Sequence, residues 1–193
     1  MAVAAKNVLV GAPDQATTGA ILSAPVGTTL PTSAVDTPDP EFTDSGYVSS
    51  DGLTLTPERS TTDITDWSGA LVRRILESFN GTLNWAHLEV NEDSLANAFG
   101  DDHVFVTPAD GTHGKQIEVQ IGAHEMPRKS WVFKIKDGLN RVLIVVPDGQ
   151  VTETGEISFV KSGAITLPVT LATYPDADGN SIYIYTDDGV TAA

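Results

Sequence analysis

The sequence predicts a mainly β protein, an antiparallel sandwich or barrel with one short flanking helix and a long N-terminal arm. Three observations lead to this class. From Tyr47 onwards, apolar and polar residues alternate in short stretches that recur about every eight to twelve residues. Turn-forming Gly, Pro, Asn and Asp residues separate these stretches. Only one stretch, about 91–99, has both the start and the stop signals of a helix.

The N-terminal segment, residues 1–45, predicts little regular structure. Residues 11–45 are rich in turn formers, and Pro38 and Pro40 exclude a regular strand or helix around them. A segment of this composition cannot bury a core by itself, so we expect an extended arm or long loop that lies on another surface. The remainder, residues 46–193, is expected to form a single β domain.

Strands are predicted after this arm from their residue patterns. They are expected at 53–60, 115–123, 130–136, 141–147, 164–172 and 181–186. The stretch 141–147 is continuously apolar, which is typical of a strand that is covered on both faces. Turns that contain Gly, Asp and Asn are predicted at 136–140, 147–150 and 175–181.

Residues 70–79 can be interpreted in two ways. Their apolar residues have the spacing of one helical face: Leu71, Val72, Ile75, Leu76 and Phe79. However, Asn80-Gly81 follows directly, and an Asn-Gly pair between two apolar stretches is a strong hairpin signal. We therefore predict a β-hairpin formed by residues 70–79 and 82–90.

The predicted helix covers about residues 91–99. Asn91 is a suitable N-cap, and two acidic residues follow it at the positive end of the helix dipole. Gly100 can end the helix. Leu95 and Phe99 lie four residues apart on one face, and they must dock onto the sheet because so short a helix is unstable alone.

Two acids, Asp101 and Asp102, follow this helix at the negative end of its dipole, where their charge is mildly unfavourable. We expect a basic residue elsewhere to compensate them, for instance one on a neighbouring molecule. The sequence Gly100–His103 also combines possible metal ligands. No HExxH motif and no second histidine at ligand spacing accompany it, so a solvated loop is the preferred interpretation.

Residues 176–188 resemble a calcium-binding loop in part. Asp176, Asp178 and Asn180 occupy the first, third and fifth ligand positions. However, the sixth position is Ser181 rather than glycine, the twelfth is not glutamate, and no helices are predicted on either side. A hairpin turn is the preferred interpretation, and Ca²⁺ binding is the alternative.

The composition narrows the classes of function. The chain has 193 residues, with 26 acidic against 11 basic residues and a net charge of −15. Such a charge repels nucleic acid and anionic membranes, although it can also serve solubility alone. The chain has no cysteine, no apolar run long enough to span a membrane, and no serine-nucleophile or phosphate-loop motif. We expect neither an enzyme nor a cofactor.

Trp67 lies near Ile64 in a polar segment, where neither apolar side chain should face solvent. Two interpretations stay open: packing under a loop of the same chain, or packing against another subunit. Arg73 and Arg74 are consecutive strand residues that point to opposite faces, so one can serve its own subunit and the other a neighbour. The candidate interface residues are therefore Ile64, Trp67, Arg73, Arg74, Asp101 and Asp102.

Several stretches together resemble a known family. They are NVLVGAPDQATTGAI, SGYVSSDGLTLTPE, TTDITDWSGALVRRILESFNGTLNWAHLEVNEDSLANAFG (61–100), GEISFVKSGAITLPVTL and YPDADGNSIYIYTDDG. In this order they resemble the major tail proteins, the tail tube subunits of bacteriophages with long non-contractile tails, especially phages of actinobacterial hosts. The resemblance spans nearly the whole chain, and the stretch 61–100 is its most specific part.

The resemblance implies a tail tube fold, six copies per ring, and rings stacked into a hollow tube through which the genome leaves. Contacts between rings would come from residues 1–45, the loop around 51–68 and the C-terminus, and no C-terminal immunoglobulin-like domain is expected. The implied partners are further copies of the chain, a tape measure protein in the lumen, and tail terminator and tail-tip proteins at the ends. The implied location is the virion tail, after assembly in the host cytoplasm.

An acidic lumen would let DNA pass without adhering to the wall. Glu118 lies on the polar face of its predicted strand and Glu156 is placed similarly, so we expect both to line the lumen. The alternative function is that of another virion β protein: a capsid decoration protein, or a tail-tip module that binds a receptor or glycan. That alternative predicts a trimer or monomer with an exposed cluster of aromatic residues.

Overall fold

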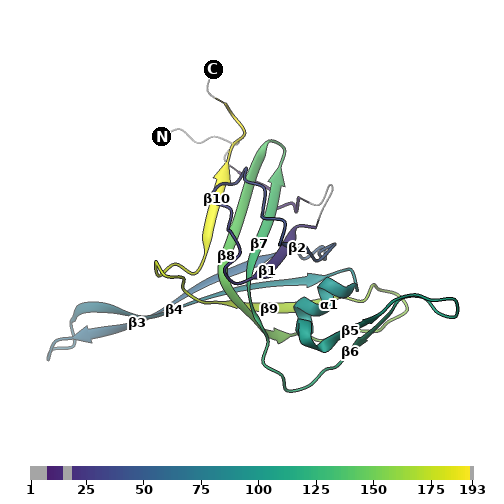
Figure 1. Cartoon of the computed structure of the whole chain (residues 1–193). Coiled ribbons are helices and arrows are strands. Elements are labelled where there is room, and N and C mark those ends of the chain that lie inside the picture. The colour runs from purple at the N-terminus through teal and green to yellow at the C-terminus, as the bar shows by residue number, and fades with distance from the viewer. Residues whose placement is uncertain (1–7, 15–18, 192–193) are drawn as a thin grey trace.

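The computed structural model describes residues 8–14 and 19–191 and has the predicted class, mainly antiparallel β with one α-helix. Its strands are β1 (Ile21–Pro25), β2 (Thr43–Asp44), β3 (Thr54–Thr65), β4 (Leu71–His87), β5 (Val104–Thr107), β6 (Gln116–Val119), β7 (Arg128–Asp137), β8 (Asn140–Thr154), β9 (Leu167–Thr173) and β10 (Tyr183–Asp187). The large sheet has the order β2-β1-β7-β8-β9-β4-β3, with β10 also paired to β8, and β5 and β6 form a separate pair. Figure 1 shows β7, β8 and β10 running across the direction of β3, β4 and β9.

Strand β8 connects these two directions because it is long and bent. Its residues 141–145 pair with β10, whereas its residues 149–154 pair with β9. Between Lys129 and Trp131 of β7 the register shifts, which marks a β-bulge, and the Ser130 hydroxyl donates to the Pro147 carbonyl over 2.6 Å. The turn predicted at 147–150 is therefore wrong: these residues bend the strand and do not end it.

The hairpin predicted around Asn80-Gly81 is also wrong. β4 continues through both residues and pairs with β3, with Gly81 opposite Pro57, and the hairpin turn lies instead between Thr65 and Leu71. Glycine is required at position 81 by a close approach, since a Cβ there would lie 2.5 Å from the Thr173 hydroxyl oxygen. Close packing against a neighbouring strand, and not a turn, therefore explains the glycine of the Asn-Gly pair.

The main core lies between the two groups of strands that run across each other, β7 and β8 on one side and β4 and β9 on the other. It joins Trp131 and Phe133 of β7 to Leu83 and Trp85 of β4 and to Leu171 of β9, and all five side chains are buried. The rings of Trp85 and Phe133 meet edge to face with centroids 5.4 Å apart, a favourable geometry for an aromatic pair. This packing holds the two halves of the sheet together.

A second core cluster covers the other face of β1, β7 and β8. Leu22, Val132 and Val145 point to this side, and Ala34 and Phe42 from the segment after β1 close over them. The apolar stretch 141–147 is thus covered on both faces, as predicted. The N-terminal region also contains β1, which is buried within the sheet, and the loop that follows lies on the protein's own core.

The predicted helix is confirmed as α1 (Glu92–Phe99). The Asn91 side chain accepts from the Ser94 backbone N–H over 2.8 Å, and the Ser94 hydroxyl accepts from the Asn91 N–H over 3.0 Å, which completes a capping box. Gly100 ends the helix with a φ of +94°, a conformation that strongly favours glycine. Leu95 is buried, as expected for a helix that docks by its apolar face.

Candidate assembly interface

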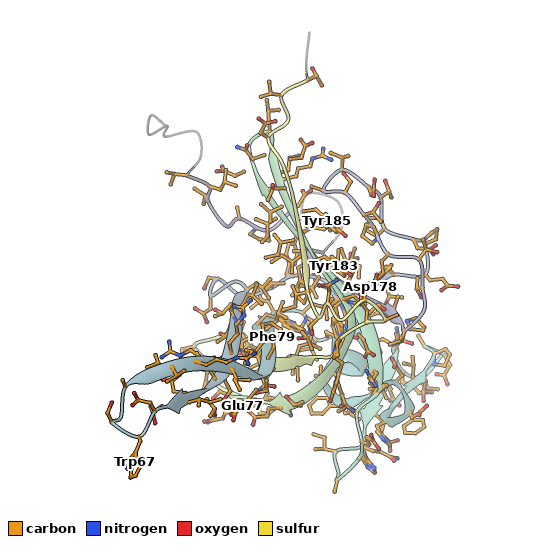
Figure 2. All side chains as sticks on the ribbon, turned by 90° about the vertical axis from the view of Figure 1, so that its left-hand side faces the viewer. Trp67, Glu77, Phe79, Asp178, Tyr183 and Tyr185 are labelled. Carbon is orange, nitrogen blue, oxygen red and sulfur yellow. The ribbon has the colours of Figure 1, made fainter. Side chains whose placement is uncertain are left out.

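The feature of the fold that stands apart from the core is the far part of the β3–β4 hairpin. Residues 57–78 are all exposed, and Figures 1 and 2 show this ribbon projecting from the body with Trp67 at its end. We call residues 57–80 the hairpin arm. At about 3.3 Å per strand residue, its nine residues from Pro57 to Thr65 extend the ribbon by roughly 30 Å.

The hairpin arm exposes many large apolar side chains. They are Ile64, Trp67, Leu71, Val72, Ile75 and Leu76. These residues are distributed over both faces of the ribbon. An isolated two-stranded hairpin is marginally stable in water, and large apolar residues exposed along it indicate an interaction site. Trp67 is fully exposed (105%), so it does not pack under a loop of its own chain. Of the two interpretations of Trp67, packing against another molecule is the one that the geometry favours.

Polar interactions across the two strands fix the shape of the arm. Arg74 donates two hydrogen bonds to the Asp63 carboxylate, at 2.6 and 2.9 Å, and this bonding lowers the pKa of Asp63. The Arg59 guanidinium lies 5.4 Å from the centre of the Phe79 ring, within range of a cation–π interaction. At the tip, the Asp66 carboxylate accepts from the Ser68 hydroxyl and from the Ala70 N–H. These interactions hold the two strands of the arm together within the single chain.

The predicted interface residues have different surroundings. Arg74 is engaged by Asp63 of its own chain, whereas the Arg73 side chain, beside Ile64 in the register, makes no hydrogen bond or ion pair within the described part of the chain. Arg74 thus serves its own chain, and a contact of Arg73 with a neighbouring subunit stays a prediction. Asp101, by contrast, is compensated within its own chain, because Lys129 Nζ lies 2.7 Å from its carboxylate.

Asp102 and the two predicted lumen residues are all exposed. Glu118 lies in β6, as expected. Glu156 does not lie in a strand: β8 ends at Thr154, and residues 155–166 form no strand before β9 begins. The comparison with Glu118 was therefore wrong, because the apolar residues after Glu156 do not pair with another strand.

A polar sheet face went unrecognised in the sequence. Strand register places Thr54 opposite Asn84 and Thr56 opposite Thr82, and Thr170 of β9 lies next to Asn84. The Thr170 hydroxyl donates to the Asn84 side-chain oxygen over 2.7 Å. We call these five residues the threonine face. The alternation of threonine with leucine in 53–56 indicates the part of the threonine face that lies on β3. Only the register shows that β4 and β9 contribute to the same face.

The segments considered for metal binding serve local structure. The Asp176 carboxylate accepts from the backbone N–H groups of Asp178 and Asn180 and from the Tyr183 hydroxyl, and the bond from Tyr183 is the largest cause that lowers the pKa of Asp176. His103 stacks on His124 with ring centroids 3.8 Å apart. No group of three or more potential metal ligands occurs among the described residues.

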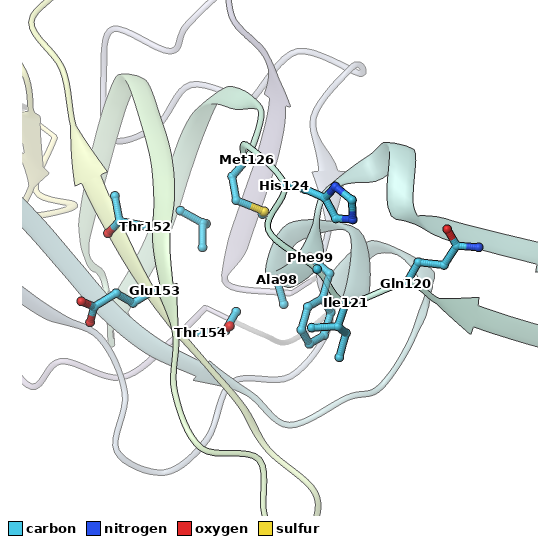
Figure 3. Close-up of a pocket in the computed structure, with 11 residues that line it drawn as sticks. Ala98, Phe99, Gln120, Ile121, His124, Met126, Thr152, Glu153 and Thr154 are labelled. Atoms are coloured by element: carbon cyan, nitrogen blue, oxygen red, sulfur yellow. The ribbon is translucent and has the colours of Figure 1, made fainter.

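A pocket beside the end of α1 has a volume of about 190 Å³ (Figure 3). Phe99, Ile121 and Met126 contribute apolar surface, and His124 and Glu153 are its titratable side chains. Gln120, Thr152 and Thr154 supply the other polar side chains of its lining. The hairpin arm differs from this pocket because its large apolar residues are exposed over its whole length.

Comparison with known proteins identifies the family of the chain. A family model described as "Phage tail tube protein" matches residues 1–193. The chain belongs to the phage tail tube protein family. No curated protein matches this tail tube protein. Among solved structures it is similar to one described as "Cryo-EM structure of the anti-feeding prophage cap (AFP tube terminating cap)", with 13% identity, a TM-score of 0.46, and coverage of 97% of this chain and 100% of the other.

Family membership settles the general role of this tail tube protein. It is a structural component of the virion tail, and it assembles with other copies and other tail proteins into the tube. No helix in the described part of the chain is long and apolar enough to cross a membrane. The more specific resemblance to phages of actinobacterial hosts stays a prediction.

Proposed function

We propose that this protein forms rings, six copies in each, that stack into a hollow tube and conduct genomic DNA into the host. The observation that carries the proposal is the hairpin arm, an ordered ribbon whose large apolar residues have no cover in the single chain. Its role as a subunit contact explains why β3 and β4 extend well beyond the core. The arm also overlaps, over residues 57–68, with the segment around 51–68 to which the family resemblance gives contacts between rings.

A second feature that supports ring formation is the outer edge of β3. This twelve-residue strand is the last in the sheet order, so no strand of the described residues pairs with its outer backbone N–H and C=O groups. An open strand edge favours pairing with another chain. A contact between this edge and a different surface of the next copy is heterologous, and repeated heterologous contacts generate rings or helical filaments.

For the lumen wall we propose the threonine face together with Glu118. Neutral hydroxyl and amide groups offer no positive charge to the phosphate backbone, and the net charge of −15 adds repulsion. DNA can then slide along the wall without adhering to it. Glu156 stays a candidate for the lumen from its charge and exposure alone.

The remaining features of the proposal concern partners and sites. The tape measure protein would occupy the lumen before ejection, and tail terminator and tail-tip proteins would bind the two ends of the tube. The proposed subunit contacts include Ile64, Trp67, Arg73 and Arg74 of the arm, and Asp101 and Asp102 next to α1. The protein acts without catalysis or cofactor, and its tube domain includes β1 and β2 of the N-terminal segment together with residues 46–193.

The test compares assembly and folding in an arm variant. We expect the wild-type protein to form rings or tubes in negative-stain micrographs, and the double variant Leu71→Ser, Leu76→Ser to remain monomeric in sedimentation. Its free energy of unfolding should stay within about 1 kcal/mol of the monomeric wild-type value, because both side chains are already exposed. The matched control is Ile121→Ser, which removes an exposed apolar residue outside the arm and should assemble normally. A wild-type protein that stays monomeric at high concentration would contradict the proposal.

A further inference from the structure

One face of the hairpin arm carries a positive charge that its own chain leaves unpaired. Strand register places Ile64 opposite Arg73, and Ile75 lies two residues further along β4, so these three side chains share one face of the ribbon. The Asp63–Arg74 ion pair lies on the other face. Arg73 is exposed, and its guanidinium makes no hydrogen bond or ion pair within the described residues. This face therefore presents a free cation beside two exposed isoleucines.

The charge of the chain is unevenly divided between the arm and the rest. The arm, residues 57–80, holds 4 of the 26 acidic residues and 3 of the 11 basic residues. It is therefore almost neutral, and nearly all of the net charge of −15 belongs to the remainder of the chain. Complementary charge favours a contact between Arg73 and an acidic surface on the body of a second copy.

An acidic pocket lies beside His103, just beyond the C-terminal end of α1, with a volume of about 380 Å³. Asp102 and Glu125 line it, and neither carboxylate makes a hydrogen bond or ion pair with the described residues. Met126 and Pro127 supply apolar lining next to them. Helix α1 has no basic residue in its last turn, so the negative end of its dipole adds to the negative charge here.

The basic side chains nearest to this pocket are already engaged. The Arg128 guanidinium, which lines the pocket, donates two hydrogen bonds to the Asp148 carboxylate and lies 4.3 Å from the centre of the Tyr174 ring. Lys129, the next residue, is paired with Asp101. The two carboxylates of the pocket are thus suited to a cation from outside the subunit. A guanidinium fits this role, because its planar fork of N–H donors can bridge two carboxylates.

Arg73 of the same chain cannot reach this pocket. Gln150, which lines the pocket, lies opposite Ala172 of β9, and Ala172 lies opposite Thr82 of β4. Arg73 lies nine residues further along β4, which at about 3.3 Å per residue places it roughly 30 Å from this row. Figure 1 shows the arm and α1 on opposite sides of the body. An Arg73 that fills the pocket must belong to a second copy, and such a contact joins two different surfaces, as a ring or a helical tube requires.

We propose that Arg73 of one subunit binds between Asp102 and Glu125 of a neighbouring subunit. Ile64, beside Arg73 on the arm, then packs against the apolar part of the pocket lining. This inference rests on the proposed tube assembly and names the pair of surfaces that forms one of its contacts. It also explains the unfavourable position of Asp102 after α1, since a cation from the next subunit compensates the charge there.

An exchange of the two charges tests this pairing. We expect Arg73→Asp and Asp102→Arg, each alone, to raise the protein concentration needed for assembly by roughly tenfold or more, because each brings like charges together at the contact. The double variant Arg73→Asp, Asp102→Arg should assemble at a concentration within roughly threefold of wild type, because the two effects are coupled. Sedimentation over a concentration series measures all three variants.

The matched control for this recovery is Asp178→Arg, the same change of charge at an exposed aspartate outside the pocket. Combined with Arg73→Asp, it should not restore assembly. Arg73, Asp102 and Asp178 are all exposed, so the free energy of unfolding of each variant, measured with urea, should stay close to that of the monomeric wild type. This measurement separates a loss of contact from a loss of folding.

Cysteine cross-linking locates the contact while both charges stay intact, because the natural chain contains no cysteine. A variant with both Ile64→Cys and Pro127→Cys, treated with a short bismaleimide, should give a ladder of covalent multimers. Each single variant should give dimers at most. The control pairs Ile64→Cys with Ser162→Cys, an exposed position outside the pocket, and should not form the ladder.

The outcomes separate this inference from the proposed function. If wild-type tubes form but the exchanged charges restore no more assembly than the Asp178 control, the pairing is wrong and tube formation stands. The same conclusion follows if the Pro127 pair gives no more multimers than the Ser162 pair. If the wild-type protein forms no assembly, the proposed function itself fails, and this inference fails with it.

Discussion

His87 is a titratable residue in the core that the sequence did not single out. Its ring is fully buried in β4, and its Nε2 accepts a hydrogen bond from the Trp85 indole N–H over 2.9 Å. The second ring nitrogen, Nδ1, therefore carries the proton of the neutral ring, and it has no hydrogen-bond partner among the described residues. Burial lowers the pKa of His87 from 6.5 to about 4, because a charged imidazolium would lose its hydration.

This geometry predicts an acid-sensitive core. The folded-state pKa lies below the unfolded-state value, so the stabilisation is complete above pH 6.5 and is lost as the pH falls from 6.5 towards 4. The full shift corresponds to about 3 kcal/mol. We expect the free energy of unfolding, measured with urea, to fall between pH 7 and pH 4.5. This fall should be larger in the monomeric arm variant than in the same variant with His87→Gln. An equal fall in both would contradict the assignment, and His113→Gln on the surface is the control.

At the scale of single elements, the neighbouring strands decide where β4 continues and where it turns. The Asn-Gly pair that predicted a turn lies in mid-strand, where Gly81 provides room for Thr173 and Ile182. β8 shows the same lesson, because the Pro-Asp-Gly sequence that predicted a turn lies at a bulge where the strand changes partners. In both strands, pairing across the sheet overrides the local turn preference.

The variant Gly81→Ala tests this account of β4. We expect it to lower the free energy of unfolding by roughly 1–3 kcal/mol, as for overpacking, because the new methyl group would overlap the Thr173 hydroxyl and the Ile182 side chain. Urea denaturation of the monomeric arm variant provides the measurement. Gly111→Ala is the matched control, since a Cβ at that glycine meets no atom within 4 Å. A neutral Gly81→Ala result would indicate that the strands are less closely packed there.

At the scale of the whole molecule, one face of the sheet is polar where β3, β4 and β9 lie side by side, while the protein as a whole is strongly acidic. The threonine face carries hydroxyl and amide groups across β3, β4 and β9, and its five residues bring no basic side chain. Contacts along a lumen wall multiply over many subunits, so even one positive charge per subunit would bind DNA strongly. A neutral wall in an acidic subunit is consistent with rapid passage of a polyanion.

A lysine placed on this face should therefore make the tube retain DNA. We expect tubes of Thr54→Lys to pellet with a short DNA duplex at low salt, with severalfold more DNA than wild type, and to release it as salt is raised. Thr54 is exposed, so the substitution should leave folding unchanged. The control Ala109→Lys adds the same charge in an exposed loop outside this face. Equal retention by both variants would place the threonine face outside the lumen.

The sequence by itself determined the fold class, the short capped helix and most strand positions. These depend on local causes: the alternation of side chains along a strand, the capping side chain of Asn91, and the continuous apolar stretch that became the doubly covered half of β8. The family resemblance, carried by long ordered stretches of sequence, identified the tail tube role that the family comparison then confirmed. Local features of the sequence also favoured a solvated loop at 100–103 and a hairpin turn at 176–188 over metal sites.

Only the tertiary structure decided where β4 turns, how β8 bends, which acid is already compensated, and which side of the sheet is polar. Each of these depends on residues that are far apart in the chain, such as Gly81 and Thr173, or Asp101 and Lys129. It also showed that Trp67 is fully exposed at the end of an arm that extends beyond the core. Local patterns carry no information on such distances, because they arise only when separate strands pack against one another.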